Sequence, residues 1–195
     1  KKPTCCDKGQ MEYTCRRCAH NYIEKYEGTA YTATQIYDEY KKTVGEIITY
    51  DEHKNVIGIG SCIVYTSEGY LVTNYHVIEG AYSAQVEIDG QIYPVQNVLA
   101  FDKFIDIAIV QIDAKMLKPA VWCEYPHAAG TIVYALGSSY GLTLSLSQGI
   151  VSHANREING VKYVQHSAPI SEGNSGGPLI NEYGEVIGIN TMSLL

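Results

Sequence analysis

Past residue 45 the chain is a succession of short apolar runs separated by polar, glycine-containing turns. Runs of this length and spacing predict β-strands, and strands joined by frequent turns favour a barrel or a sandwich. The dipeptides Asp89-Gly90 and Asn159-Gly160 are typical of type I′ hairpin turns. We therefore expect an all-β fold, with strands at 57–59, 61–65, 69–73, 85–88, 91–95, 104–110, 131–136, 161–164 and 185–189.

One segment ahead of these runs has the periodicity of a helix. Apolar residues recur there at the spacing of one helical face, which predicts a helix over 34–44. The recurring positions are Ile36, Tyr37, Tyr40 and Val44. Thr34 is the expected N-cap, and the capping box is expected to be missing because position 37 is neither Glu nor Gln.

A candidate nucleophile, Ser175, stands in the string EGNSGGPL at residues 172–179. A serine hydroxyl needs a neighbouring base to become a nucleophile, and attack on a carbonyl needs backbone N–H groups aimed at the developing oxyanion. Glycines on both sides let the chain turn tightly and leave room for a substrate. The string suits an acyl-transfer site, although the same residues also make an ordinary turn.

A candidate base and a candidate acid occur elsewhere in the chain. His76 follows the run 69–73, and Asp106 lies inside the β-branched run 104–110. A carboxylate within an apolar strand is costly unless it is paired, and a histidine N–H is its natural partner in a catalytic triad. The order His, Asp, Ser along the chain is that of chymotrypsin.

Other titratable residues fit other roles better. Asp102 is expected to be a solvated carboxylate at a strand entrance, and His166 is expected to line the cleft without taking the proton. The remaining polar-segment histidines, His53, His127 and His153, are expected to be exposed or merely hydrogen-bonded.

The strings TNYHV, DIAIV, YALGSSYGL, SQGIVS, SEGNSGGPLIN and GEVIGINT, taken together and in this order, resemble the trypsin-like serine proteases of the HtrA (Deg) type. The resemblance covers residues 44–191 and implies two six-stranded antiparallel β-barrels with a triad in the cleft between them. It makes His76 the general base, Asp106 its orienting partner and Ser175 the nucleophile. The backbone N–H groups of Gly173 and Ser175 would form the oxyanion hole.

The resemblance also implies a pocket for the substrate residue before the scissile bond. The pocket residues would be Ile170, Asn190, Thr191 and Ser193. None of them is acidic, so we expect cleavage after small or medium apolar residues such as Val, Ala or Leu rather than after Arg or Lys.

Four cysteines near the start of the chain form a separate group. Cys15 and Cys18 make a CxxC that resembles one knuckle of a zinc ribbon, and Cys5 and Cys6 would complete a tetrahedral thiolate site for structural zinc. Adjacent cysteines do not easily reach one metal, so His20 is an alternative ligand to Cys5. The competing interpretation is disulfides or free thiols. No cofactor is expected for catalysis.

Composition narrows the partners and the compartment. The formal net charge is −7 with no basic stripe, which disfavours nucleic acid and leaves protein or peptide substrates as the expected partners. No apolar run approaches the roughly 20 residues of a membrane span. Cys62 and Cys123 lie in apolar strings as expected buried thiols, which favours a cytoplasmic location. A secreted or periplasmic protein with its signal removed is the alternative.

These observations predict a zinc-ribbon-like segment at 1–27 and a trypsin-like protease domain at 28–195 whose last strand is missing. The predicted function is that of a serine endopeptidase acting through a triad and an acyl-enzyme. The alternative is a latent or non-catalytic protease-fold scaffold that uses the cysteine-rich segment 1–27 to contact other proteins. Family analogy adds a homo-oligomer or a regulatory partner as an expectation.

Overall fold

The computed structural model describes residues 11–14, 21–24, 29–123, 127–138 and 144–191. Its two helices are α1 (Ala33–Tyr40) and α2 (Tyr75–Ile78). The strands are β1 (Met11–Thr14), β2 (Asn21–Glu24), β3 (Val44–Tyr50), β4 (Val56–Val64), β5 (Tyr70–Thr73), β6 (Ser83–Ile88), β7 (Gln91–Asp102), β8 (Ile107–Ile112), β9 (Ile132–Gly137), β10 (Ser145–Ile158), β11 (Val161–His166), β12 (Pro178–Asn181) and β13 (Val186–Ile189).

Six antiparallel strands close into a barrel in the order β3-β4-β5-β8-β7-β6. Side chains that alternate along these strands point inward, as β8 shows with a strict alternation of half-buried and buried positions. Ile47, Val64, Leu71, Val86 and Val110 are fully buried in its core. Each such side chain stabilises the fold by about 1.5–3 kcal/mol relative to an exposed one.

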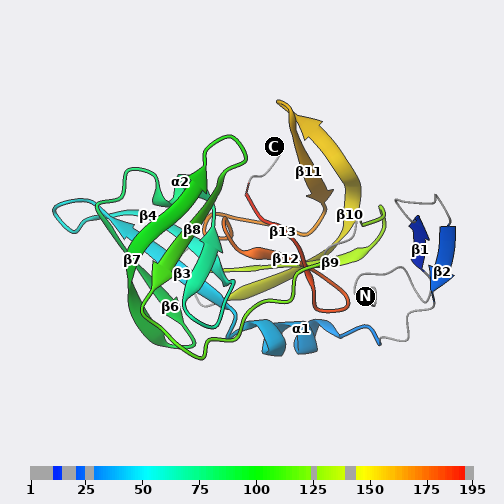
Figure 1. Ribbon diagram of the computed structural model, residues 1–195, viewed down its shortest axis with the longest axis horizontal. Helices are drawn as coiled ribbons and strands as arrows, with labels where there is room; N and C mark the ends of the chain where they lie inside the picture. The colour runs from blue at the N-terminus through cyan, green and yellow to red at the C-terminus, as the bar shows by residue number, and fades with distance from the viewer. Residues whose placement is uncertain (1–10, 15–20, 25–28, 124–126, 139–143, 192–195) are drawn as a thin grey trace.

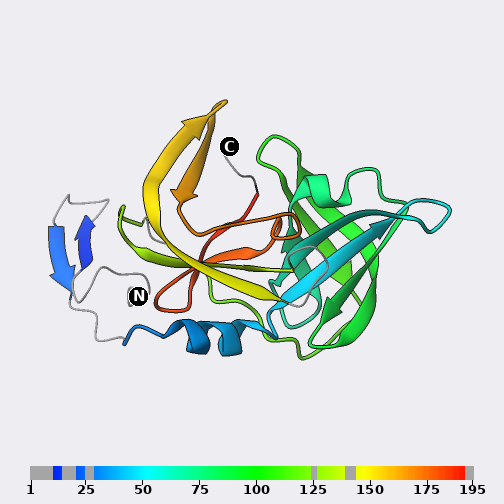
Figure 2. The ribbon, with the colours of Figure 1, turned by 180° about the vertical axis from the view of Figure 1, so that it is seen from behind.

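The second unit is a curved sheet of five described strands in the order β11-β10-β9-β12-β13. Figures 1 and 2 show it beside the closed barrel, open between the edge strands β11 and β13. The resemblance to two six-stranded barrels therefore holds for the first unit, whereas the described residues form a half-barrel in the second.

Both predicted hairpins are confirmed in register and in turn type. Asp89 and Gly90 have positive φ angles of 50° and 75°, and they join paired residues of β6 and β7. Asn159 and Gly160 have φ angles of 52° and 82° and join β10 to β11 in the same way. Positive φ at both central residues is the requirement of a type I′ turn.

The helix begins earlier than predicted. Thr32, not Thr34, is the N-cap, because its hydroxyl accepts a hydrogen bond from Gln35 N at 3.3 Å. The Gln35 side chain in turn accepts from Thr32 N at 2.8 Å, so the capping box expected to be missing is complete. The prediction failed because the cap position was placed two residues too late, and Val44 begins β3 instead of ending the helix.

α1 covers one face of the second sheet. Ile36 and Tyr40 are buried against side chains of β9 and β12, among them Leu136 and Ile180. The Tyr40 hydroxyl donates to the Gly184 carbonyl at 2.8 Å, and burial raises the pKa of this phenol. Neither helix in the described ranges is long and apolar enough to cross a membrane.

Near the start of the chain, β1 pairs with β2 as an antiparallel hairpin. The predicted metal ligands Cys5, Cys6, Cys15 and Cys18, and the alternative ligand His20, lie outside the described residues. The predicted boundary between 1–27 and 28–195 stays a prediction.

Candidate active site

His76 is held by the closed barrel, in the short helix α2 that follows β5. The sequence pattern predicts only the end of a strand here, whereas the structure has a helix. The His76 backbone N–H donates to Asp106 Oδ1 at 2.9 Å, and the ring Nδ1 lies 2.7 Å from Asp106 Oδ2. These two contacts fix both the position of the residue and the orientation of its ring, while 46% of the side chain stays exposed.

Asp106 lies in the turn before β8, and the prediction that it lies within a strand is wrong. Its φ of 57° is left-handed, a conformation that non-glycine residues seldom adopt. The turn forms because Asp102, at the end of β7, accepts hydrogen bonds from the backbone N–H groups of Phe104 and Ile105. Asp102 is exposed, as expected, but it lies at the end of β7 and not at the entrance of a strand.

Two residues that sequence analysis did not connect with the acid hold Asp106. Asn74 Nδ2 donates to the Asp106 carbonyl at 2.8 Å. Thr191 Oγ1 donates to Asp106 Oδ2 at 2.6 Å. Thr191 was predicted to line the substrate pocket, and no local signal in the sequence reveals this second contact, because it spans 85 positions of the chain.

Ser175 comes from the second unit, in the loop between β11 and β12. Its hydroxyl donates to the Thr191 carbonyl at 3.3 Å. Among the described residues, no hydrogen bond joins this hydroxyl to His76. Thr191 therefore contacts the serine through its carbonyl and the aspartate through its hydroxyl, and His76 is linked to it through Asp106.

In the loop around Ser175, the N–H groups of Gly173 and Ser175 have no backbone partner in the described part of the chain. Three amides beside them are bonded: Asn174 N donates to the Ser171 carbonyl, Gly176 N to that of Asn190, and Gly177 N to that of Asn174. Gly173 N and Ser175 N are the two donors that the resemblance assigns to an oxyanion hole.

The glycine after the serine is required by a close approach between the two units. Gly176 has a φ of 86°, and a Cβ atom there would lie 2.1 Å from the Ser61 carbonyl oxygen and 2.4 Å from Thr73 Oγ1. Ser61 and Thr73 belong to β4 and β5 of the closed barrel. Glycine at this position lets the loop between β11 and β12 that carries Ser175, called the serine loop below, lie directly against the barrel that carries His76.

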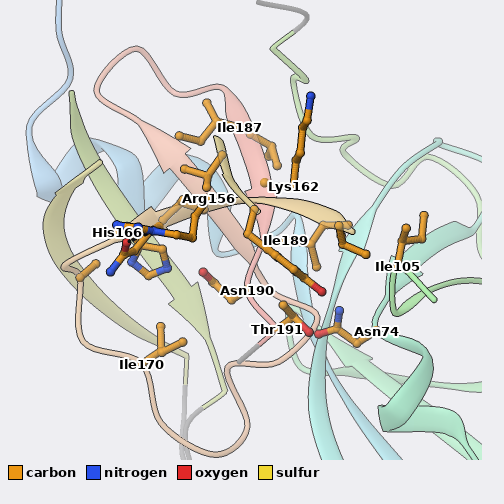
Figure 3. A pocket seen from close by; sticks show the side chains of 18 of the residues that line it. Asn74, Ile105, Arg156, Lys162, His166, Ile170, Ile187, Ile189, Asn190 and Thr191 are labelled. Atoms are coloured by element: carbon orange, nitrogen blue, oxygen red, sulfur yellow. Dashed lines mark hydrogen bonds between the residues drawn. The ribbon is translucent and has the colours of Figure 1, made fainter. Parts of the chain in front are cut away.

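A cavity of about 630 Å³ extends between β11 and β13, and the predicted triad residues are not part of its lining. Three of the four predicted pocket residues line it, namely Ile170, Asn190 and Thr191, whereas Ser193 lies outside the described residues. Asn74 also lines the cavity, and Figure 3 shows it next to Thr191. Most of the remaining lining is apolar, and none of the described residues that line the cavity is Asp or Glu.

His166 lines this cavity, as expected, and lies near Asn190 in Figure 3. Burial lowers the pKa of its imidazole, while the Ala168 carbonyl and the Asn190 side chain act in the opposite direction. Burial also lowers the pKa of His127. His53 and His153 are exposed, as predicted.

No group of three or more His, Cys, Asp or Glu side chains within the described ranges is arranged to hold a metal ion. Cys62 is fully buried, as predicted, and burial raises the pKa of its thiol to about 12. Cys123 is half-buried.

Comparison with known proteins identifies the family of this chain. Residues 60–189 match the model of the trypsin-like peptidase domain family. The periplasmic pH-dependent serine endoprotease DegQ of Escherichia coli (strain K12) is 34% identical over 178 residues, which are 87% of this chain and 39% of that protein. Protease Do-like 1, chloroplastic, of Arabidopsis thaliana is 38% identical over 144 residues, covering 69% of this chain and 33% of that protein.

A solved structure, the serine endoprotease from Yersinia pestis, superposes with a TM-score of 0.74 at 31% identity. The match covers 85% of this chain and 59% of that one. The chain spans less than half the length of the curated relatives named above. It belongs to the trypsin-like peptidase domain family and has homologues among the HtrA and Deg proteases.

Proposed function

We propose that this chain is a serine endopeptidase that hydrolyses peptide bonds through His76, Asp106 and Ser175. The observation that carries the proposal is a chain of contacts: Thr191 bonds both Ser175 and Asp106, and the Asp106 carboxylate bonds His76 twice. The family and the named relatives support the same reaction class.

The hydrogen bonds support a separate role for each residue of the proposed triad. An ionised Asp106 only accepts, so His76 Nδ1 carries a proton and Nε2 offers its lone pair. Rotation of the Ser175 hydroxyl away from the Thr191 carbonyl would let His76 take its proton as the oxygen attacks the substrate carbonyl. The N–H groups of Gly173 and Ser175 would stabilise the oxyanion, and His76 would return the proton to the leaving amine. Water then hydrolyses the acyl-enzyme.

Covalent labelling with a fluorophosphonate tests this proposal. Ser175→Ala should abolish both labelling and peptide hydrolysis, and His76→Ala should lower both by several orders of magnitude, because the triad acts as a unit. His53→Ala is the matched control, since His53 is exposed and its ring contacts Glu52 instead of the site. Peptidase activity that persists unchanged in Ser175→Ala would overturn the assignment.

The pocket supports a substrate preference for small or medium apolar residues before the scissile bond. Ile170, Ile187 and Ile189 line the cavity, and the described part of its lining holds no carboxylate to pair with a basic side chain. A peptide library should therefore be cleaved after Val, Ala or Leu. Cleavage confined to Arg or Lys would contradict this preference.

A second candidate is a latent enzyme or a protease-fold scaffold, and one observation favours it. The Ser175 hydroxyl is bonded to the Thr191 carbonyl and not to His76. A regulatory partner or self-association that shifts this loop would complete the triad. Labelling that appears only at high protein concentration or with added peptide indicates latency, and labelling that never appears indicates a scaffold.

We propose structural zinc for the N-terminal segment. The CxxC formed by Cys15 and Cys18 stands, along the chain, between the paired strands β1 and β2, which suits a metal-binding knuckle. Cys6 and either Cys5 or His20 would supply the remaining ligands. Metal analysis of the purified chain should give about one zinc per molecule. Cys18→Ser should lose it and Cys123→Ser should keep it.

We also propose an exported location. The related proteins include periplasmic endoproteases of bacteria and a chloroplast protease of Arabidopsis thaliana, and these relatives do not support the cytoplasmic expectation. Fractionation of cells that produce the native protein tests this, because recovery in the cytosolic fraction would contradict it.

A further inference from the structure

Ser61, on β4 of the closed barrel, is completely buried and uses every hydrogen-bonding group it has. Its backbone N–H donates to the Ser175 carbonyl at 2.7 Å, and its hydroxyl donates to the Gly173 carbonyl at 2.7 Å. The same hydroxyl accepts from Ser138 N at 2.9 Å, and the Ser61 carbonyl accepts from Thr73 Oγ1 at 2.7 Å. One residue of the first unit therefore donates two hydrogen bonds to carbonyls of the serine loop.

These two hydrogen bonds hold the backbone segment whose N–H groups the proposed reaction would use. Gly173 and Ser175 flank Asn174, and their N–H groups are the proposed oxyanion donors. Gly173 has a φ of 94°, and a glycine does not hold one backbone orientation by itself. A bond to its carbonyl from outside the loop restricts the rotation that would swing the neighbouring amides away.

The bond from the Ser61 hydroxyl also spans the two units. Ser61 shares the closed barrel with His76 and Asp106, whereas Gly173 and Ser175 belong to the second unit. Ser138, at the end of β9, anchors the other side of the hydroxyl, and its own side chain donates to the Glu46 carboxylate on β3. The chain of contacts from Glu46 through Ser138 and Ser61 to the serine loop ties the proposed nucleophile to the barrel that carries its base.

We infer that Ser61 is a positioning residue for peptide-bond hydrolysis, whose hydroxyl holds the backbone that carries the Gly173 and Ser175 amides through its bond to the Gly173 carbonyl. This inference rests on the proposed function. Ser61 touches neither the substrate nor the reacting atoms. Its loss should weaken stabilisation of the transition state, because the oxyanion donors must already be in place when that state forms.

Ser61→Ala is the direct test. Losing one oxyanion donor outright costs roughly 100-fold to 1,000-fold in kcat, so a donor that is only loosened should cost about 10-fold to 100-fold. KM should stay within about twofold, because ground-state peptide binding does not use these amides. A peptidyl boronate, which forms a tetrahedral adduct with the serine, should bind more weakly by the same factor as the loss in kcat.

Thr49→Val is the matched control. Thr49 is fully buried in β3 of the same barrel, and its hydroxyl donates to the Gly58 carbonyl at 3.2 Å without contacting the serine loop. It should lower the melting temperature about as much as Ser61→Ala and leave kcat unchanged. Equal kcat losses in the two variants would reduce Ser61 to a general stabilising residue and overturn the inference.

Ser61→Cys keeps a weaker donor at the same site and should give a kcat between those of the wild type and Ser61→Ala. Hydrogen exchange over residues 171–177 supplies a readout that needs no activity, and it should be faster in Ser61→Ala than in Thr49→Val. A wild-type chain that stays inert at high protein concentration and with added peptide would refute the proposed function while leaving this exchange test in force. Unchanged exchange together with unchanged kcat would refute the positioning role alone.

Discussion

The left-handed backbone of Asp106 makes Asn74 the residue whose loss should disturb the acid most. Asn74 Nδ2 bonds the Asp106 carbonyl, and this contact offsets part of the cost of a positive φ. Asn74→Ala should allow the turn to relax and move the carboxylate away from His76. We expect kcat/KM to fall about tenfold, and a proton NMR spectrum should show a loss or shift of the His76 Nδ1 proton signal.

Asn97→Ala serves as the comparison for Asn74. Asn97 is exposed on the same barrel, and its amide donates to Gln111 at 3.1 Å, away from the acid. It should leave both measurements unchanged. An Asn74→Ala variant with wild-type kcat/KM would show that Asp106 keeps its geometry without this bond.

His76, Asp106 and Ser175 could be predicted from the sequence, because each lies in a distinctive local motif. The residues that hold them could not be found in this way. Ser61 and Thr191 act through contacts with partners 112 and 85 positions away. A lone Ser or Thr within an apolar run has no local feature that distinguishes such a role from ordinary packing.

At the level of elements, the start of α1 offers a sharp test between two caps. Thr32→Ala removes the side chain that accepts from Gln35 N and should cost about 0.5–2 kcal/mol of stability. Thr34→Ala, inside the first turn, should be neutral or slightly stabilising, because Ala has the higher helix propensity. Urea denaturation of both variants measures the difference. The reverse ranking would restore the cap that sequence analysis predicted.

Elements with strict local chemistry were predictable, and elements decided by packing were not. The hairpins at Asp89-Gly90 and Asn159-Gly160 follow from the backbone that each dipeptide prefers. By contrast, two expected strands at 57–59 and 61–65 are one strand, β4, because pairing with β3 continues through Gly60. Helix α2 has only four residues and is too short to produce a periodic signal.

For the molecule as a whole, two histidines should make stability depend on pH. Burial lowers the pKa of His166 and of His127 below the ordinary value of 6.5, so the unfolded chain takes up protons first as the pH falls. The free energy of unfolding should hold steady above this value and decrease below it. His166→Gln should reduce the slope of the free energy of unfolding against pH, and His53→Gln should leave this slope unchanged. A slope unaffected by His166→Gln would remove this residue as a cause.

The overall architecture lay partly beyond sequence reasoning. Alternating apolar positions predict strands that have one buried face, and the resemblance extended this to two barrels. Closure depends instead on pairing between distant strands, such as β3 with β6, which no local pattern encodes. The same limit applies to the packing of the Ser175 loop against the closed barrel, which depends on how two separate sheets meet.

The cavity between β11 and β13 has Trp122 in its wall, and this is the single tryptophan of the 195-residue sequence. Its ring meets that of Tyr65 edge-on at 5.9 Å. Excitation of the native chain near the indole absorption band therefore reports on one location. Any peptide that enters should change the emission maximum or intensity, so occupancy can be followed optically without attaching a dye.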